Sequence, residues 1–246
     1  MNLQEIRKAK AEVRRQVSHV LAGLPLGRRR DTGIAVARRL ATLPPVLRAR
    51  TIMAFLSLPT EVDTWPAIQW AWREGKRIVI PRIEAGPEGC DAPLSASPCV
   101  AGFAEQGRQR RMVAVALDLP AGRHGAADIP AAADHPAVRP GALGILEVPD
   151  AAPVPVAEID VVLVPCQAVD RRGNRLGKGG GFYDRFLADP DLRAETIALA
   201  FHEQLLDEVP VAEGDRRVRR LVTDEEILVF DVGSGRESLE KGVEFV

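Results

Sequence analysis

The sequence predicts an α/β fold: a single three-layer domain with a largely parallel, Rossmann-like sheet flanked by helices. The first observation behind this prediction is a strand–helix–strand unit. Residues 51–58 and 76–81 are short apolar runs with β-branched residues, and residues 64–75 between them have a helical pattern. Thr64 stands at the expected N-cap of that helix and Gly75 at its expected C-cap.

The second observation is a glycine-rich loop in the setting where parallel sheets bind ligands. The apolar run 159–165 predicts a buried strand, and residues 182–189 begin a helix. The stretch 175–184, RLGKGGGFYD, lies between them. We expect this loop at the carboxyl end of a strand, facing a ligand.

Helices are expected at the N-terminus. Residues 2–24 place hydrophobic side chains at three- and four-residue steps, which is typical of an amphipathic helix. A second helix is expected over 29–42, with Pro44 and Pro45 ending it.

The C-terminal third predicts further elements of the same sheet. Strands are expected over 195–201 and 218–224, with a short helix near 203–209 between them.

Two segments depart from this regular pattern. Residues 84–140 are rich in Ala, Pro and Gly, and only 111–117 within them predicts a strand, so we expect a loop-rich excursion. Residues 231–246 predict a flexible tail. The single domain is therefore expected to span residues 1–230.

Charge is balanced over the chain but uneven along it. The formal net charge is −1, so no global field attracts nucleic acid or an anionic membrane. Residues 1–50 carry 12 Lys and Arg against 3 Asp and Glu, while the other 196 residues carry 21 against 31. The basic segment has no interleaved aromatic residues, which disfavours nucleic-acid binding. We expect small-molecule partners, no nucleic acid and a monomer.

The cysteines and the hydropathy pattern indicate a cytoplasmic protein. Cys90, Cys99 and Cys166 are widely spaced and give no disulfide framework, which favours a reducing compartment. The N-terminal segment has no apolar core of a secretory signal, and no apolar run approaches the length of a membrane span.

The residue types in the glycine-rich loop point to a polyphosphate and its metal. Glycines allow a close backbone approach and positive φ, and successive N–H groups in such a loop bind anions. Arg175 and Lys178 add positive charge, and Asp184 stands where a carboxylate can share Mg²⁺ with phosphates. No Ser or Thr follows Lys178, so the loop is not a Walker motif.

Several of these residues also have ordinary structural interpretations. Lys10 and Arg14 lie four residues apart, which by itself indicates a solvated basic helix face, with Lys8 as a competing cation. Without other information Glu61 and Asp215 are polar turn residues. Zinc is not expected, because His124, His135 and His202 have no Cys or acid at ligand spacing.

A family resemblance strengthens the functional interpretation. Residues 173–187, GNRLGKGGGFYDRFL, closely resemble the signature of the 5-formyltetrahydrofolate cyclo-ligase family. Other blocks similar to that family follow in the family's order: residues 53–64, 76–83, 141–149, 159–165, 170–177 and 197–215. The resemblance implies a ligase that uses ATP, with Mg²⁺ as cofactor, to close 5-formyltetrahydrofolate to 5,10-methenyltetrahydrofolate, releasing ADP and phosphate.

The resemblance also implies roles for individual residues. Lys10 and Arg14 match the family's ATP-phosphate motif, and Arg175 and Lys178 match positions that act in catalysis. The ATP-binding loop would comprise Arg175, Leu176, Gly177, Lys178, Gly179, Gly180, Gly181, Phe182 and Tyr183. The folate would contact Leu56, Glu61, Lys178, Gly179, Gly180, Gly181 and Phe182. Asp184 and Asp215 match the metal positions, which predicts that they lie close together.

Some positions differ from the family's usual residues, and two alternatives follow. Cys166 and Gln167 stand where Gly and Leu are usual, Lys178 stands where Arg or an aromatic residue is common, and Phe182 replaces a common Tyr. One alternative is a divergent non-catalytic paralogue that binds folate or nucleotide. The other is a sugar-phosphate isomerase or acyl-transfer enzyme, which would need a carboxylate base in its anion site and no ATP.

Overall fold

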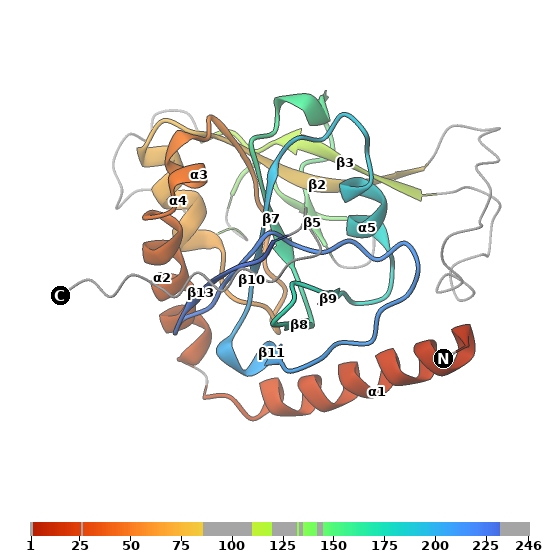
Figure 1. Cartoon of the computed structure of the whole chain (residues 1–246). Helices are drawn as coiled ribbons and strands as arrows, with labels where there is room; N and C mark the ends of the chain where they lie inside the picture. Colours follow the sequence, from red (N-terminus) through yellow and green to blue (C-terminus); the bar gives the residue numbers. More distant parts are fainter. Residues whose placement is uncertain are drawn as a thin grey trace.

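An eight-stranded sheet forms the centre of the computed structural model, which describes residues 2–25, 27–85, 110–119, 132, 135–141 and 145–231 (Figure 1). The strand order is β13-β12-β10-β7-β1-β2-β3-β6. The five central strands from β12 to β2 are parallel, and β13, β3 and β6 pair antiparallel at the two edges. Its strands are β1 (Thr51–Met53), β2 (Arg77–Ala85), β3 (Arg110–Ala116), β6 (Pro153–Val154), β7 (Val161–Pro165), β10 (Glu195–Leu199), β12 (Arg220–Val222) and β13 (Ile227–Val229).

Two smaller sheets accompany the central one. The first has the order β11-β8-β9, with β8 (Ala168–Asp170), β9 (Arg175–Leu176) and β11 (Leu205–Leu206). The second pairs β4 (Arg139–Pro140) with β5 (Leu146–Glu147). The predicted α/β class with a largely parallel sheet is confirmed.

Helices lie on both faces of the central sheet. In Figure 1, α2 (Arg28–Leu40), α3 (Pro44–Arg48) and α4 (Trp65–Arg73) stack along one face, and the short α5 (Phe182–Leu187) lies on the other. The helix α1 (Leu3–Ala22) runs beneath β8, β9 and β11. Its first turn is capped by Asn2, whose side chain accepts from two backbone N–H groups.

The central strands are buried on both faces, so their side chains build two cores. Ile52, Val161 and Leu163 point to the core shared with α2, α3 and α4, whereas Met53 and Val162 point to the core shared with α5. This alternation is what a parallel sheet covered on both sides requires, and it explains the near-continuous apolar strand sequences. None of the helices among the described residues is long and apolar enough to cross a membrane.

Most predicted elements are present, with shifted ends. The helices predicted over 2–24, 29–42, 64–75 and 182–189 correspond to α1, α2, α4 and α5. The strand predicted over 51–58 is shorter, because ladder pairing is confined to β1. Pro44 and Pro45 lie beyond the end of α2 and form the first turn of α3, where a proline needs no N–H partner.

Thr64 occupies the predicted N-cap position of α4, whereas the predicted C-cap at Gly75 needs correction. The Thr64 side chain does not cap the helix, because its Oγ1 donates to the Phe55 carbonyl at 2.5 Å. Asp63 Oδ1 instead accepts from the Trp65 N–H at 3.0 Å. The C-cap residue is Glu74, and Gly75 follows it with a φ of 70°.

The prediction of a helix near residues 203–209 is wrong. Only a 3₁₀ turn over His202–Gln204 forms, and the chain then enters β11. The cause is the buried amide of Gln204, whose Nε2 donates to the carbonyls of Cys166 and Gln167 at 2.8 and 3.0 Å. These bonds hold the following residues alongside β8, which favours an extended backbone.

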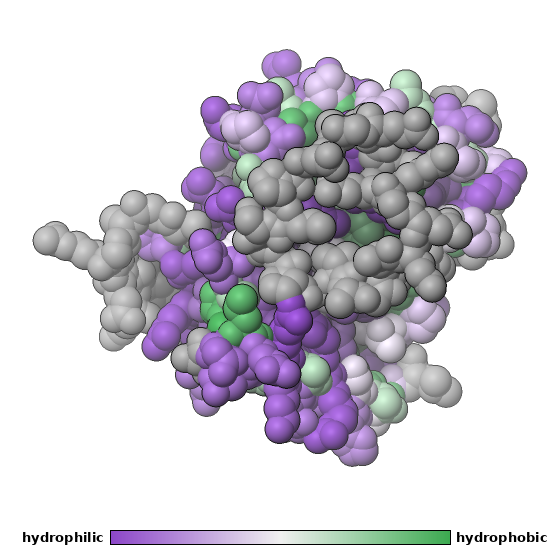
Figure 2. All heavy atoms as spheres, turned by 90° about the vertical axis from the view of Figure 1, so that its right-hand side faces the viewer, coloured by the Kyte–Doolittle hydropathy of each residue, from purple (hydrophilic) through white to green (hydrophobic). Residues whose placement is uncertain are grey.

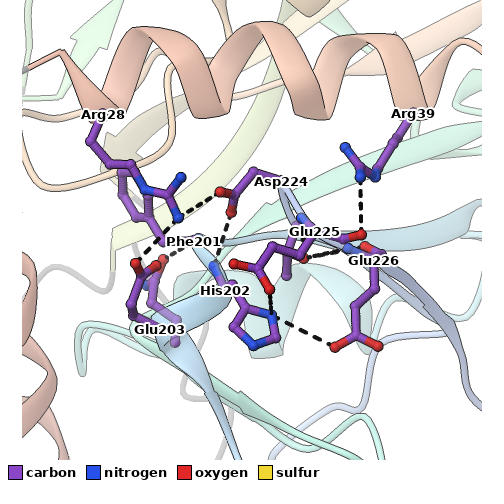
Figure 3. Close-up of polar contacts among 10 residues, drawn as sticks. Arg28, Arg39, Phe201, His202, Glu203, Asp224, Glu225 and Glu226 are labelled. Carbon is purple, nitrogen blue, oxygen red and sulfur yellow. Dashed lines mark hydrogen bonds and ion pairs between the residues drawn. The ribbon is translucent and has the colours of Figure 1, made fainter.

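Polar contacts connect the helix α2 to the C-terminal part of the chain, near β12 and β13 (Figure 3). The Arg28 guanidinium lies 2.6 Å from Asp224 Oδ2 and 3.2 Å from Glu203 Oε1. Farther along the same helix, Arg39 donates to the Glu225 carbonyl at 2.9 Å. Two anchors at opposite ends of α2 therefore fix its position against the β12–β13 connection.

Two predicted segments fall largely outside the described residues. The tail predicted over 231–246 is described only at Asp231. Within the predicted excursion over 84–140, the strand predicted at 111–117 is confirmed as β3, while residues 86–109, 120–131, 133 and 134 lie outside the described part.

Candidate active site

A cavity of about 300 Å³ lies beyond the carboxyl ends of the neighbouring parallel strands β1 and β7. Among its lining residues, Phe55 and Leu56 follow β1. Pro165 is the last residue of β7, and Cys166 follows it. Ligands commonly bind at this edge of open α/β sheets. The helix α1 closes the cavity from one side, with Lys10 and Arg14 in its lining.

The glycine-rich loop forms a second side of the cavity. Gly179 and Gly181 have φ angles of 107° and 63°, which L side chains rarely adopt. A Cβ atom at Gly179 would lie 3.7 Å from the Arg14 guanidinium. Arg14 itself donates from Nε to the Gly177 carbonyl at 2.8 Å, so α1 and the loop are held together.

Three cation–carboxylate pairs line the cavity. Lys10 Nζ lies 2.5 Å from Asp215 Oδ2, and an Arg175 nitrogen lies 2.7 Å from Asp184 Oδ1. Both cations are almost fully buried, with side chains 6% and 2% exposed. The third pair joins Lys178 Nζ to Glu61 Oε1 at 2.9 Å, and here the lysine is 43% exposed.

The remaining wall of the cavity is apolar. Most of the apolar side chains come from β2, β3 and the segment after β1, and Ile145 and Phe182 add to them. A planar, partly hydrophobic ligand suits this wall, while an anion suits the cations of the cavity. The apolar lining residues are Phe55, Leu56, Leu58, Pro81, Ile83, Met112, Ile145 and Phe182.

Two buried groups in the lining stay protonated at neutral pH. Burial raises the pKa of the Cys166 thiol to about 12, and burial also raises the pKa of the Tyr183 hydroxyl. Neither group therefore supplies an anionic nucleophile. The Tyr183 hydroxyl and the Arg175 Nε are buried without a hydrogen-bond partner among the described residues, which leaves both able to bond a ligand.

The two predicted metal carboxylates lie at the same end of the cavity. Asp184 Oδ1 accepts from the backbone N–H of Arg216, the residue after Asp215, at 3.2 Å. Among the described residues, the hydrogen bonds of Asp184 use Oδ1 and those of Asp215 use Oδ2. Each carboxylate therefore keeps its second oxygen for another ligand.

The described residues contain no ready-made metal cage. No group of three or more His, Cys, Asp or Glu side chains there is arranged around a common point. A metal ion between Asp184 and Asp215 would need further oxygen ligands, which phosphates and water can supply.

Every residue predicted for the site lines this one cavity. Sequence spacing did not separate Lys10 from Lys8, but the structure does, because Lys8 is exposed and Lys10 is buried. The residues that line it are Lys10, Arg14, Leu56, Glu61, Arg175, Leu176, Gly177, Lys178, Gly179, Gly180, Gly181, Phe182, Tyr183, Asp184 and Asp215.

Asp170 is a structural residue of the site that the sequence analysis did not single out. It is fully buried, and its carboxylate accepts from the backbone N–H groups of Arg172, Asn174 and Val209 at 2.9 to 3.3 Å. These bonds fix the turn that leads into β9 and the glycine-rich loop. An Asp at the end of a strand, followed by a Gly-Asn turn, was the available signal.

The chain matches a known protein family over most of its length. Residues 6–224 match the 5-formyltetrahydrofolate cyclo-ligase family. The match covers most of the chain and includes both the α1 cations and the glycine-rich loop.

The chain belongs to the 5-formyltetrahydrofolate cyclo-ligase family. It is therefore an enzyme of the ligase class, and an isomerase or acyl-transfer enzyme is excluded as its class.

Individual cyclo-ligases show the same relationship. The chain is 29% identical to the 5-formyltetrahydrofolate cyclo-ligase of Escherichia coli K12 over 198 residues, which cover 80% of this chain and 90% of that protein. It is 40% identical to the Mycolicibacterium smegmatis cyclo-ligase over 112 residues, covering 43% and 58% of the two chains. The mouse cyclo-ligase is 24% identical over 225 residues, covering 89% and 96%.

Solved cyclo-ligase structures share the fold. The 5,10-methenyltetrahydrofolate synthetase of Aquifex aeolicus superposes with a TM-score of 0.66 at 22% identity, covering 94% of this chain and 97% of that one. The synthetase of Mycoplasma pneumoniae gives a TM-score of 0.58 at 16% identity, covering 88% and 99%.

Proposed function

We propose that this enzyme closes 5-formyltetrahydrofolate to 5,10-methenyltetrahydrofolate and converts ATP to ADP and phosphate. The observation that carries the proposal is that one cavity is lined both by cations with a glycine-rich loop and by apolar side chains with the Glu61 carboxylate among them. A polyphosphate suits the first group and a reduced folate the second. Family membership supports the reaction class.

The chemistry explains why the site needs cations more than a nucleophile. The formyl oxygen attacks the γ-phosphorus of ATP, forming an iminium phosphate and releasing ADP. N10 of the folate then attacks the activated carbon, and phosphate leaves as N10 loses its proton. Catalysis of such a transfer depends on positioning and on stabilising charge on the moving phosphoryl group.

The positive side chains are assigned to the phosphates. Lys10 and Arg14 on α1 would hold the ATP phosphates, while Arg175 and Lys178 would stabilise charge on the transferred group. Backbone groups from Leu176 to Tyr183 would border the nucleotide.

The folate is assigned to Glu61 and the apolar side chains of the cavity. Glu61 Oε1, which pairs with Lys178, would also accept from donor groups on the pterin ring, with Leu56 and Phe182 packing on the ring faces. The glycine residues Gly179 to Gly181 and the Lys178 side chain would lie between the two ligands, where the phosphoryl group moves.

Asp184 and Asp215 fit a magnesium ion bound together with ATP. Each keeps one carboxylate oxygen, and both lie beside the cations assigned to phosphate. Mg²⁺ typically binds one or two carboxylates, substrate phosphates and water. When bound, it would offset the negative charge of the phosphates.

The decisive test follows the methenyl chromophore by near-ultraviolet absorbance of purified protein with 5-formyltetrahydrofolate. An increase in this absorbance that requires both ATP and Mg²⁺ would support the proposal. If calorimetry detects binding of folate or nucleotide but the absorbance does not increase, a non-catalytic paralogue would be favoured instead. A cytoplasmic location and a monomeric state are part of the same proposal, tested by cell fractionation and sedimentation.

A further inference from the structure

We propose that Arg29 is a positioning residue for folate recognition, because it locks the turn that presents Glu61 to the cavity. This inference rests on the proposed role of Glu61 in binding the folate. Arg29 belongs to the first turn of α2 and is absent from the cavity lining among the described residues. Its effect on the substrate is therefore indirect.

The Leu58–Glu61 turn divides the two oxygens of Glu61 between different tasks. The Glu61 N–H donates to the Leu58 carbonyl at 3.0 Å, and the Leu58 N–H donates to Glu61 Oε2 at 2.8 Å. Oε2 is thereby bound within the turn. Oε1 faces Lys178 at 2.9 Å and is the oxygen presented to the cavity.

Arg29 holds this turn from outside the cavity. Its Nε donates to the Glu61 carbonyl at 3.0 Å, and a terminal nitrogen donates to the Leu58 carbonyl at 2.8 Å. The planar guanidinium bonds both ends of the turn at once, which a single ammonium group does less well. Hydrogen bonds from a cation are stronger than neutral ones, so the turn is held firmly.

The helix that carries Arg29 is itself fixed close to the turn. A Cβ atom at Gly33, one helical turn after Arg29, would lie 2.5 Å from the Asp63 carbonyl oxygen, so α2 packs directly on the backbone after Glu61. The same helix is also anchored away from the turn: Arg28 pairs with Asp224, and Arg39 donates to the Glu225 carbonyl (Figure 3). A rigid helix thus connects the turn to the body of the sheet.

Arg28 provides a matched control for Arg29. The two arginines are neighbours on α2 and both are half-buried. Arg28, however, pairs with Asp224 and Glu203 and makes no hydrogen bond to the turn residues 58–61, all of which the structure describes. Loss of a half-buried arginine from α2 is common to Arg28→Met and Arg29→Met. Only the second change releases Leu58 and Glu61.

The first experiment measures steady-state kinetics of Arg29→Met, Arg29→Lys and Arg28→Met. We expect Arg29→Met to raise KM for 5-formyltetrahydrofolate about tenfold, with kcat and KM for ATP changed less than about twofold. Arg29→Lys should recover part of the loss, since one of its two bonds can reform. Arg28→Met should leave KM for the folate unchanged; an equal rise in both variants would overturn the proposal.

A double-mutant cycle separates positioning from general destabilisation. With Glu61→Ala as the background, Arg29→Met should raise KM by less than about twofold further, because the carboxylate it positions is gone. A full additional tenfold effect would show that Arg29 acts independently of Glu61 and would overturn the inference.

Amide hydrogen exchange tests the positioning without any substrate. Arg29→Met should speed exchange at the Leu58 and Glu61 N–H groups about tenfold, and Arg28→Met should not. Unchanged exchange at both amides would sink the proposal. If Glu61→Ala binds folate as tightly as the original protein, the assignment of Glu61 fails, and Arg29 loses its role in recognition even where exchange shows that it holds the turn.

Discussion

Lys10 and Asp215 lie 205 residues apart in the chain and form a salt bridge of 2.5 Å at one end of the cavity. Arg175 and Asp184 form a second pair of the same kind. In both pairs a cation assigned to phosphate occupies a carboxylate assigned to metal. We therefore expect phosphate and metal to favour each other's binding, because the phosphates would compete with Asp184 and Asp215 for the cations and free more of each carboxylate for the metal.

The first prediction concerns this coupling. Lys10→Met should weaken binding of a non-hydrolysable ATP analogue about tenfold or more, because a charge-assisted contact is lost. The same change should strengthen binding of Mg²⁺ alone, because Asp215 no longer has a competing cation. Calorimetric titrations of each ligand, separately and together, measure both effects.

Lys8→Met is the control for this prediction. Lys8 lies on the same helix but is exposed, so it should change neither affinity. Weaker binding of nucleotide and of Mg²⁺ alike in Lys10→Met would mean that Lys10 maintains the shape of the site rather than competing for Asp215.

The second prediction concerns Lys178, which bridges the loop and Glu61. Lys178→Ala should lower ATP-dependent turnover at least about a hundredfold, because a cation beside the transferred group is removed. Its side chain is 43% exposed, so the folded state should lose little stability. Turnover measured with a urea unfolding curve tests both parts. Lys178→Arg keeps the charge and should retain more activity; unchanged turnover in Lys178→Ala would show that the side chain is dispensable.

Where the candidate site residues are adjacent in the chain, the sequence alone was enough to group them. Residues 175–184 carry the glycines, both cations and one carboxylate within ten positions, so local chemistry was sufficient. Lys10 and Asp215 were assigned only through the family resemblance. Their pairing depends on how α1 lies against the loop before β12, which no local pattern encodes.

The incorrect predictions of local structure share a physical cause: in each case a buried polar side chain forms hydrogen bonds to backbone groups elsewhere in the chain. Gln204 holds the carbonyls after β7, and Asp170 accepts from the Val209 N–H, so residues 205 and 206 join a strand rather than a helix. Thr64 bonds Phe55 instead of its own helix. Tertiary partners decided each case, whereas propensity gave only a weak preference.

The third prediction compares two glycines with similar backbone angles. Gly173, which precedes the glycine-rich loop, has a φ of 80°, and Gly75 has a φ of 70°. A Cβ atom at Gly173 would lie 2.7 Å from the Val218 carbonyl oxygen and from a ring carbon of Phe230, whereas at Gly75 nothing lies within 4 Å. Gly75→Ala should cost about 1 kcal/mol of unfolding free energy from backbone strain alone.

Gly173→Ala should cost more, about 3 kcal/mol or above, because overpacking adds to the strain. Urea unfolding of both variants measures the difference. Equal losses would mean that the Val218 and Phe230 segments shift freely to accept the methyl group.

The fourth prediction is the effect of Cys166 on stability at alkaline pH. Burial raises the pKa of this thiol from 9.0 to about 12, so the folded state keeps a proton that the unfolded chain releases near pH 9. Between these two values the unfolded state binds fewer protons, so the free energy of unfolding falls as pH rises. The stability that the buried, protonated Cys166 thiol contributes is fully present below pH 9 and is lost as pH approaches 12.

Cys166→Ala removes this titration and should flatten the alkaline loss of stability. The difference between the two proteins should change by about 1.4 kcal/mol per pH unit above pH 9. Both proteins should carry Cys90→Ser and Cys99→Ser, so that the two chains differ in having Cys166 or no thiol at all. Urea unfolding at pH 8, 9, 10 and 11 gives the two curves. The methyl-sized space left by the substitution shifts the whole curve without changing its slope, so parallel curves would show that the thiol ionises as readily in the folded chain as in the unfolded one.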